Sequence, residues 1–336
     1  MALTINTNVS SLIAQRNLQS ATNALNASIE RMTTGFKINH ASDNAAGYSI
    51  SAMWETQLGS LSVAADNAAT GADMLTTAEE TYGLLTSHLQ RVRDLTEQAA
   101  NGTYGSQSLR SIQAEIYARL QEVDRIAANS EFNGIKLMAY KSANDGSGIK
   151  STGVNLQVGL YANEYSTINL STDLFKNASI SGIFGSMADI TGSQQLATIL
   201  TNAGSDKTKL GSATASEKEA ALQGFAAACC GMKYNANKTL SLSDTSAKEM
   251  LAYLDAGINE ISGRVTKIGA AQNRVESALS ALDVQTQNIT SSLSTLRDTD
   301  IAQESSNYIQ AQILQQASAT LLSTANQLPS IALNLI

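Results

Sequence analysis

Proline, aromatic side chains and other breaks in regular structure are scarce in this chain of 336 residues. It contains one Pro, 22 Gly and only 5% aromatic residues, although 43% of its residues are hydrophobic. Loop-dense β-sandwiches, collagen-like repeats and proline-rich linkers all need frequent chain breakers, so the composition disfavours these classes. Long, uninterrupted helices fit it best.

Cysteine and histidine are equally scarce, which limits the chemistry available to the chain. Cys229 and Cys230 are adjacent, which excludes a disulfide framework, and we expect two small buried thiols rather than metal ligands. Neither His40 nor His88 lies in a His-Glu-x-x-His helix. The segment Asp145–Gly148 holds a lone Gly-x-Gly with no phosphate-binding lysine loop. We therefore expect no enzyme, and no catalytic, metal-binding or cofactor-binding residues.

Charge and hydropathy argue against two further classes of partner. Lys and Arg number 22 against 29 Asp and Glu, a net charge of −7 with no dense basic tract, so we expect no nucleic-acid partner. No run approaches the roughly eighteen apolar residues of a membrane span, so we expect no membrane insertion. Residues 1–13 have neither the basic nor the apolar region of a secretory signal peptide, and we expect any export to use a route that reads no cleaved signal.

The two ends of the chain lack charge more than any other part. Residues 1–29 contain one charged side chain, Arg16, and residues 301–336 contain one, Glu304, although 15% of the whole chain is charged. A solvated amphipathic helix normally carries charge on its outer face. The ends are therefore predicted to be buried against other protein rather than exposed to water.

Both ends are nevertheless patterned as helices, with large apolar residues three, four or seven positions apart. These seam residues, which we expect other copies of the chain to cover, are Leu18, Leu25, Ile29, Met32, Leu314, Leu321, Leu328 and Leu335. Pro329 lies inside the last pattern and is predicted to kink or end that helix.

Three further helical patterns occupy the middle of the chain. Heptads run from Trp54 to Val92 and from Ile258 to Leu296, and a shorter pattern runs from Leu109 to Ala127. Such rods bury their apolar stripes most simply as an antiparallel bundle. Alternating apolar residues in 154–170 and an Asn-Gly turn after Phe132 predict a β-hairpin region. Residues 177–247 have weak periodicity and are predicted to form a small insert of short helices.

Several motifs, in order, resemble those of bacterial flagellins. At the N-terminal end they are Ala2–Leu12, Arg31–Asn39, Asp43–Gly47, Leu89–Leu95, Ser111–Glu115 and Glu131–Gly134. At the C-terminal end they are Gly269–Arg274, Ala311–Ala317 and Ala325–Pro329. The resemblance covers roughly residues 1–176 and 248–336. It implies a mainly α fold, a long antiparallel helical bundle with discontinuous domains named D0 and D1, a β-hairpin region in D1 and a small variable insert.

The same resemblance implies a domain order along the chain. It is a D0 N-terminal helix (1–42), the N-terminal part of D1 with two long helices and the hairpin region (43–176), a surface-exposed insert (177–247), a D1 C-terminal helix (248–298) and a D0 C-terminal helix (299–336). The two ends of the chain would then meet in one domain, although they are far apart in sequence.

The resemblance implies a structural subunit that polymerises with itself into the helical flagellar filament used for motility. It further implies export in an unfolded state by the flagellar type III system, a secreted, extracellular location, and an export chaperone, hook–filament junction proteins and a filament cap protein as partners. The alternative is a hook–filament junction protein, which is similar at both ends but acts in few copies.

The resemblance also supplies a candidate receptor surface. In many flagellins the corresponding surface of the monomer is recognised by Toll-like receptor 5. The residues at the matching motif positions here are Gln90, Arg91, Leu95, Gln113 and Glu115. The alternative is that Arg91 and Glu115 are subunit contacts or solvated charges. A receptor ligand as the primary role is disfavoured, because this surface occupies few residues and the predicted polymer contacts occupy most of the chain.

Overall fold

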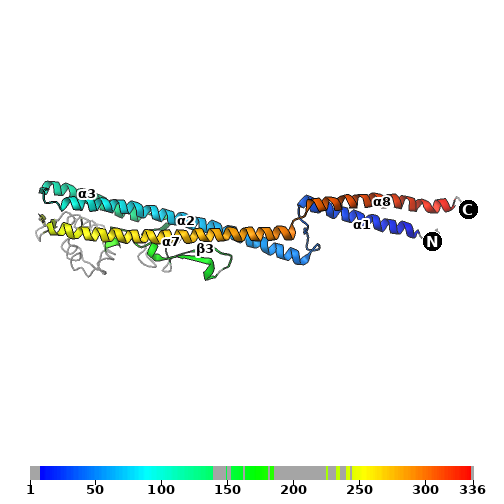
Figure 1. Ribbon diagram of the computed structural model, residues 1–336, viewed down its shortest axis with the longest axis horizontal. Coiled ribbons are helices and arrows are strands. Elements are labelled where there is room, and N and C mark those ends of the chain that lie inside the picture. Colours follow the sequence, from blue (N-terminus) through cyan, green and yellow to red (C-terminus); the bar gives the residue numbers. More distant parts are fainter. Residues whose placement is uncertain are drawn as a thin grey trace. The chain divides into compact units, whose positions relative to one another are not determined.

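The structure is a computed structural model dominated by helices (Figure 1). The residues that it describes are 8–138, 149, 153–161, 163–180, 182–184, 225, 232–234, 240–242 and 244–333. The main helices are α1 (Val9–Thr34), α2 (Ala45–Ala99), α3 (Ser106–Asn129), α7 (Asp244–Arg297) and α8 (Ile301–Leu333). The mainly α fold is confirmed.

The strands form three separate antiparallel pairs. They are β1 (Glu131–Phe132) with β2 (Ile135–Lys136), β3 (Val154–Gln157) with β4 (Thr167–Leu170), and β5 (Met232–Tyr234) with β6 (Leu240–Leu242). Two short 3₁₀ helices, η1 (Glu164–Ser166) and η2 (Thr172–Leu174), flank β4.

The chain divides into two compact units. One comprises Met1–Ser62 and Asp283–Ile336, and the other comprises Val63–Leu282. The first unit therefore combines segments from both ends of the chain. Its limits fall inside α2 and α7, whereas the limits predicted between D0 and D1 fall at 42/43 and 298/299. The D0 and D1 limits remain predictions.

The second unit has a continuous core made by the predicted heptad residues. Its α2, α3 and α7 segments each contribute side chains that are fully buried, such as Leu75, Tyr82, Ile116, Ile261 and Ile268. Full burial of one such aliphatic side chain contributes about 1.5–3 kcal/mol. The sequence periodicity thus correctly identified the residues that make this unit self-sufficient.

Polar groups buried against this core have partners. The Tyr82 hydroxyl donates a hydrogen bond to the Leu174 carbonyl oxygen at 3.0 Å, and burial raises the pKa of that hydroxyl. The Arg264 side chain is 3% exposed, and its Nη1 donates to the carbonyl oxygens of Lys176 and Asn177, each at 3.2 Å. Both contacts attach the segment that follows β4 to the helices.

The predicted hairpin region is confirmed in detail. Leu156 pairs with Ile168, so the alternating apolar residues occupy facing positions on β3 and β4. At the β1–β2 turn, Asn133 and Gly134 both have positive φ, at 48° and 80°. Asn-Gly is the sequence that tolerates this conformation best, which explains why the turn could be predicted from the sequence.

The insert and the last helix differ from expectation. The described part of 177–247 includes the β5–β6 pair, which a sequence with weak periodicity did not reveal. Cys229 and Cys230 lie outside the described residues. The last helix does not end at Pro329 but continues to Leu333; a kink at Pro329 remains a prediction.

Gly153 provides a test of how β3 is positioned. Its φ is +89°, and a Cβ atom there would lie 2.0 Å from the backbone oxygen of Leu170. We expect Gly153→Ala to destabilise the chain by about 1–3 kcal/mol, because both the backbone conformation and the space require glycine. Urea unfolding monitored by circular dichroism measures this change.

The matched control is Gly83→Ala, inside α2, where a Cβ atom would have no neighbour within 4 Å. Replacing a mid-helix glycine in open space should stabilise the chain by about 0.5–1 kcal/mol. Equal effects of the two substitutions would contradict the conclusion that position 153 requires glycine.

Candidate assembly surfaces

Helices α1 and α8 lie side by side and run antiparallel, so the two chain ends are at the same end of the pair (Figure 1). At that end, Asn8 Nδ2 donates a hydrogen bond to the Ala325 carbonyl oxygen at 2.7 Å. At the opposite end, Arg31 Nη1 lies 3.9 Å from Glu304 Oε1. Contacts between residues about 300 positions apart therefore hold the ends together.

Small side chains make the close contact between these two helices. Their buried residues, 5–9% exposed, recur at every seventh position and form two rows, here called the small rows: Ala14, Ala21 and Ser28 on α1, and Glu304, Ala311, Ser318 and Ala325 on α8. Alanine and serine allow two helix backbones to approach closely. Glu304 is the one large member of either row.

Because small residues fill the contact, the large apolar residues face outward. The exposed ones, 44–61% accessible, form what we call the outer apolar set: Val9, Leu12, Ile13, Ile29, Ile301, Ile309, Ile313, Leu314 and Leu321. This set includes three of the predicted seam residues, Ile29, Leu314 and Leu321. Exposed apolar area of this extent on one helix pair is typical of a surface that another protein covers.

The remaining seam residues are less exposed or lie outside the described part of the chain. Leu18, Leu25 and Met32 are half-buried on α1. The Leu328 side chain and all of Leu335 are outside the described residues. The structure therefore places the described seam residues at the edge of the α1–α8 contact or outside it.

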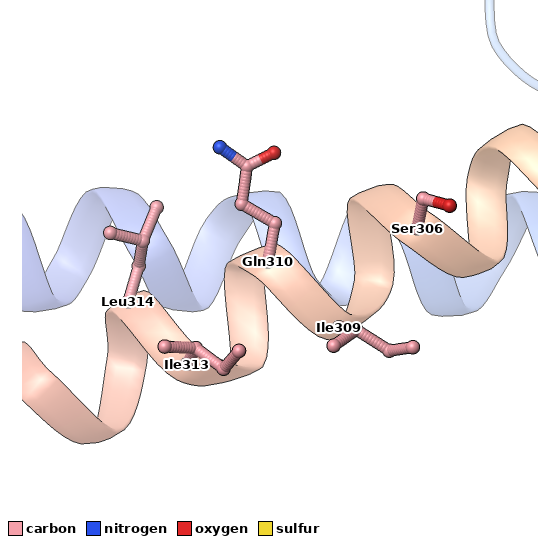
Figure 2. A pocket seen from close by; sticks show the side chains of 5 residues that line it. All are labelled: Ser306, Ile309, Gln310, Ile313 and Leu314. Atoms are coloured by element: carbon pink, nitrogen blue, oxygen red, sulfur yellow. The ribbon is translucent and has the colours of Figure 1, made fainter.

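A shallow groove on α8 illustrates this surface (Figure 2). It has a volume of about 380 Å³ and is lined by Ser306, Ile309, Gln310, Ile313 and Leu314. Figure 2 shows Ile309 and Ile313 together along one side of α8, with Gln310 and Leu314 on the other side. The polar members carry no charge, so another helix could cover the groove without desolvating an ion.

A clasp joins the segment after α1 to the segment before α8 in the same unit. Phe36 and Asp298 form an isolated antiparallel bridge, and the Lys37 N–H donates to the Arg297 carbonyl oxygen at 2.7 Å. The Arg297 guanidinium lies 3.8 Å above the Phe36 ring and pairs with Glu55. These contacts fix the point at which the two helices start to run together.

A larger cleft of about 720 Å³ lies beside the clasp. Its walls include the charged Arg31 and Lys37 and the apolar Trp54 and Leu296. Lys37 Nζ donates to the Thr295 carbonyl oxygen at 2.8 Å.

The candidate receptor residues lie on α2 and α3 in the second unit. Gln90 and Arg91 are exposed, and Gln113 and Glu115 are partly exposed. Arg91 Nη2 donates to Glu115 Oε1 at 3.1 Å, which joins the two helices at the surface. Leu95 differs from the other four: it is 2% exposed and belongs to the core beneath them.

No catalytic or metal arrangement appears in the part of the chain that the structure describes. There, no group of three or more His, Cys, Asp or Glu side chains is placed to hold a metal ion. Nor is any of its helices both long and apolar enough to cross a membrane.

Comparison with known proteins assigns the chain to a family. Residues 5–143 match the bacterial flagellin N-terminal helical region, and residues 251–336 match the bacterial flagellin C-terminal helical region. The chain is 32% identical to flagellin D of Vibrio cholerae over 376 aligned residues, which cover both chains fully. The chain belongs to the bacterial flagellin family.

Two further flagellins are similar over their full length: polar flagellin F of Vibrio parahaemolyticus, at 32% identity, and flagellin D of Vibrio anguillarum, at 33%. The crystal structure of Bacillus cereus flagellin is 18% identical with a TM-score of 0.39, and the alignment covers 65% of this chain and 88% of that one. Flagellins are structural proteins of the extracellular bacterial flagellar filament, and that role is therefore assigned to this chain.

Two features of this flagellin were missed by reading the sequence. The first is the pair of small rows, whose signal was present as Ala and Ser at every seventh position of both ends. The second is an aromatic tip between β3 and β4, where Tyr161 and Tyr165 are 61% and 97% exposed.

The turn beside the clasp has a testable pH dependence. The Asp43 carboxylate accepts hydrogen bonds from the backbone N–H groups of His40 and Asn39, at 3.0 and 3.1 Å, and these bonds lower the pKa of Asp43 below its ordinary value of 3.8. The stabilisation is present above pH 3.8 and is lost as the pH falls through the lower folded pKa. We expect the amide resonances of Asn39 and His40 to titrate with a midpoint below 3.8.

The control for this titration is Asp43→Asn, which keeps the size of the side chain but removes its charge. In this variant the amide resonances of Asn39 and His40 should show no such transition. A midpoint at or above 3.8 in the unaltered chain would contradict the proposed hydrogen bonds.

Proposed function

We propose that this flagellin polymerises with itself through the outer apolar set of α1 and α8. The single observation that carries the proposal is that these helices expose large apolar residues while carrying only four charged side chains, Arg16, Glu30, Arg31 and Glu304. Covering such a surface releases water from apolar groups at little cost in desolvated charge. A contact between different surfaces of identical copies generates an open helical array, which is the form of a filament.

The layers of the filament follow from the same argument. Helices α1 and α8 form the inner D0 layer, with limits near 42 and 299, because their surfaces are the ones that need cover. The helices with a complete core of their own form D1, and the insert at 177–247 lies outside. The self-sufficient core of the second unit supports this order.

Export and accessory partners are part of the proposal. The chain travels unfolded through the flagellar type III system, where a chaperone protects its C-terminal end, and it joins a filament between the hook–filament junction proteins and the cap protein. The apolar surface of α8 supports a need for protection before assembly. The alternative role, in the hook–filament junction itself, is less favoured because the full-length relatives are named flagellins. Copy number in sheared filaments distinguishes the two roles.

A substitution on the α8 groove tests polymerisation directly. Ile313 is 60% exposed, and burying a whole isoleucine contributes about 1.5–3 kcal/mol. We expect Ile313→Ser to raise the critical concentration for polymerisation by about tenfold, the factor that corresponds to about 1.4 kcal/mol. Sedimentation of filaments over a concentration series gives this value.

The matched control is Gln316→Ser, an exposed polar position three residues further along α8. It should leave the critical concentration within about twofold, since surface polar changes are usually worth less than 0.5 kcal/mol. Deleting 301–336 should abolish growth while the helices of the second unit stay folded. Growth of filaments from the deleted chain would refute the proposal.

We propose a second role for the released monomer, as a ligand of Toll-like receptor 5. Gln90, Arg91, Gln113 and Glu115 present a charged and polar surface on α2 and α3, and buried Leu95 supports it from below. In the polymer this surface would be covered by neighbouring copies. Recognition would therefore require monomer.

Receptor-dependent signalling in reporter cells tests this role. We expect Arg91→Ala to weaken the response to monomer by about tenfold, because it removes both a charged contact and the nearer of the two arginines that pair with Glu115. Arg125→Ala is the matched control, since Arg125 also forms an exposed ion pair, with Glu122 on α3, but lies outside the candidate set. An equal loss in both variants would argue for a general effect of removing surface charge.

A further inference from the structure

We propose that Asn101 and Gly102 form a site of spontaneous covalent modification, at which the folded chain converts the Asn101 amide into a carboxylate and releases ammonia. The site lies in the loop between α2 and α3, inside the second unit, so the proposal does not depend on polymerisation. It rests on the contact that the Asn101 side chain makes in this loop. It also rests on the different geometry of the only other Asn-Gly pair in the sequence, Asn133–Gly134.

An Asn-Gly pair carries both reactants of an intramolecular reaction. The backbone nitrogen of the glycine loses its proton to hydroxide and attacks the side-chain amide carbon (Cγ) of the asparagine, and the new N–C bond closes a succinimide ring. The bond from Cγ to the side-chain nitrogen breaks, and that nitrogen takes a proton from water and leaves as ammonia. Water then opens the ring at either carbonyl, which gives aspartate or isoaspartate. The net reaction consumes one water and releases one ammonia, and glycine favours it because no Cβ hinders the approach.

The Asn101 side chain is held in position for this attack. Asn101 is exposed, and its Oδ1 accepts a hydrogen bond from the backbone N–H of Thr103 at 3.3 Å. A bond to the residue two positions ahead folds the side-chain amide over the peptide group between them, whose nitrogen belongs to Gly102. The same N–H faces the oxygen on which negative charge develops during the attack, so it stabilises the transition state.

The loop also permits the backbone rotation that ring closure requires. The Asn101 N–H donates to the Gln98 carbonyl oxygen at 3.2 Å, and the Tyr104 N–H donates to the Asn101 carbonyl oxygen at 3.4 Å. Both bonds are longer than the usual length of about 2.9–3.0 Å and are therefore weak. Gly102 lies in open space, since a Cβ atom there would have no neighbour within 4 Å. Little has to be broken for the two reacting atoms to meet.

The pair Asn133–Gly134 has the same residues in a geometry that opposes the reaction. Both residues have positive φ in the β1–β2 turn, and an ion pair of 2.6 Å between Lys136 and Glu131 lies across the two strands. Ring closure would rotate the Asn133 carbonyl group out of the turn and disrupt this pairing. In the described part of the chain, no backbone N–H donates to the Asn133 side chain.

The product changes the charge at the end of α2. Position 101 becomes negative beside the C-terminal end of the helix, where the unpaired carbonyl groups already carry partial negative charge. The last turn of α2 contains no basic residue that could compensate. Isoaspartate also adds one methylene group to the backbone, which disrupts the turn at Thr103. The α2–α3 loop therefore becomes less well held as the protein ages, without the action of an enzyme.

Timed incubation of the full chain, followed by proteolysis and mass spectrometry, measures both Asn-Gly pairs in one sample. Methyl transfer by an isoaspartate methyltransferase then distinguishes isoaspartate from aspartate. We expect Asn101 to react about tenfold faster than Asn133, which corresponds to about 1.4 kcal/mol in activation free energy. The reaction should accelerate from neutral to mildly alkaline pH, because the attacking nitrogen must lose a proton. In concentrated urea the two rates should converge, since the fold then no longer distinguishes the pairs.

Two glycine substitutions in the loop complete the test. Gly102→Ala should slow the reaction at Asn101 by about tenfold, because the methyl group hinders the attack although it meets no other atom. The matched control, Gly105→Ala, also places a methyl group in open space and should leave the rate within about twofold. Circular dichroism verifies that both variants keep the helical fold.

Three results would overturn the proposal. The first is a rate at Asn133 that equals or exceeds the rate at Asn101 in the folded chain. The second is a ratio of the two rates that urea leaves unchanged, because the sequence alone would then explain it. The third is an Asn101 that stays intact in the folded chain over a period in which the unfolded chain reacts.

Discussion

The close contact between α1 and α8, made by alanine and serine side chains, determines which apolar residues are left for other molecules. Had leucine and isoleucine filled that contact, the pair would have buried its own apolar surface and had little to offer a neighbour. Small residues bring the backbones together but bury little area. The outer apolar set therefore remains exposed on a helix pair that has only four charged side chains, one of them on α8.

In the second unit the same types of large apolar residue are buried instead of exposed. There heptad residues such as Leu75, Ile116 and Tyr82 fill the space between α2, α3 and α7 and are fully buried, while Arg91, Arg93 and their carboxylate partners lie at the surface. One chain thus combines a unit that satisfies its apolar residues internally with a unit that does not. This contrast is what a subunit of an extended polymer requires, because it must be stable alone and yet bind its copies.

The sequence predicted the helices well, since heptads such as Ile261, Ile268 and Val275 are long and regular. It was less able to say which face of a helix meets which neighbour. On α8, Leu314 and Leu321 share a period of seven with Ala311 and Ser318, which stand three residues before them. On α8, the row of leucines and the small row have the same periodicity. Only the spacing of the two helix backbones therefore decides that the small row, and not the leucines, faces α1. The β5–β6 pair had no such signal, because short strands in a region rich in small polar residues leave no clear alternation.

The position of the two chain ends has a consequence for how the molecule is made. Asn8 contacts Ala325 across 317 residues of sequence, so this part of the fold has a very high contact order. The α1–α8 pair cannot form until the chain has been synthesised past Ile301, whatever the rest of the molecule has done by then. A product that terminates before Ile301 therefore lacks the whole helix pair, although it can contain the complete second unit. The topology itself excludes such products from any structure built on that pair.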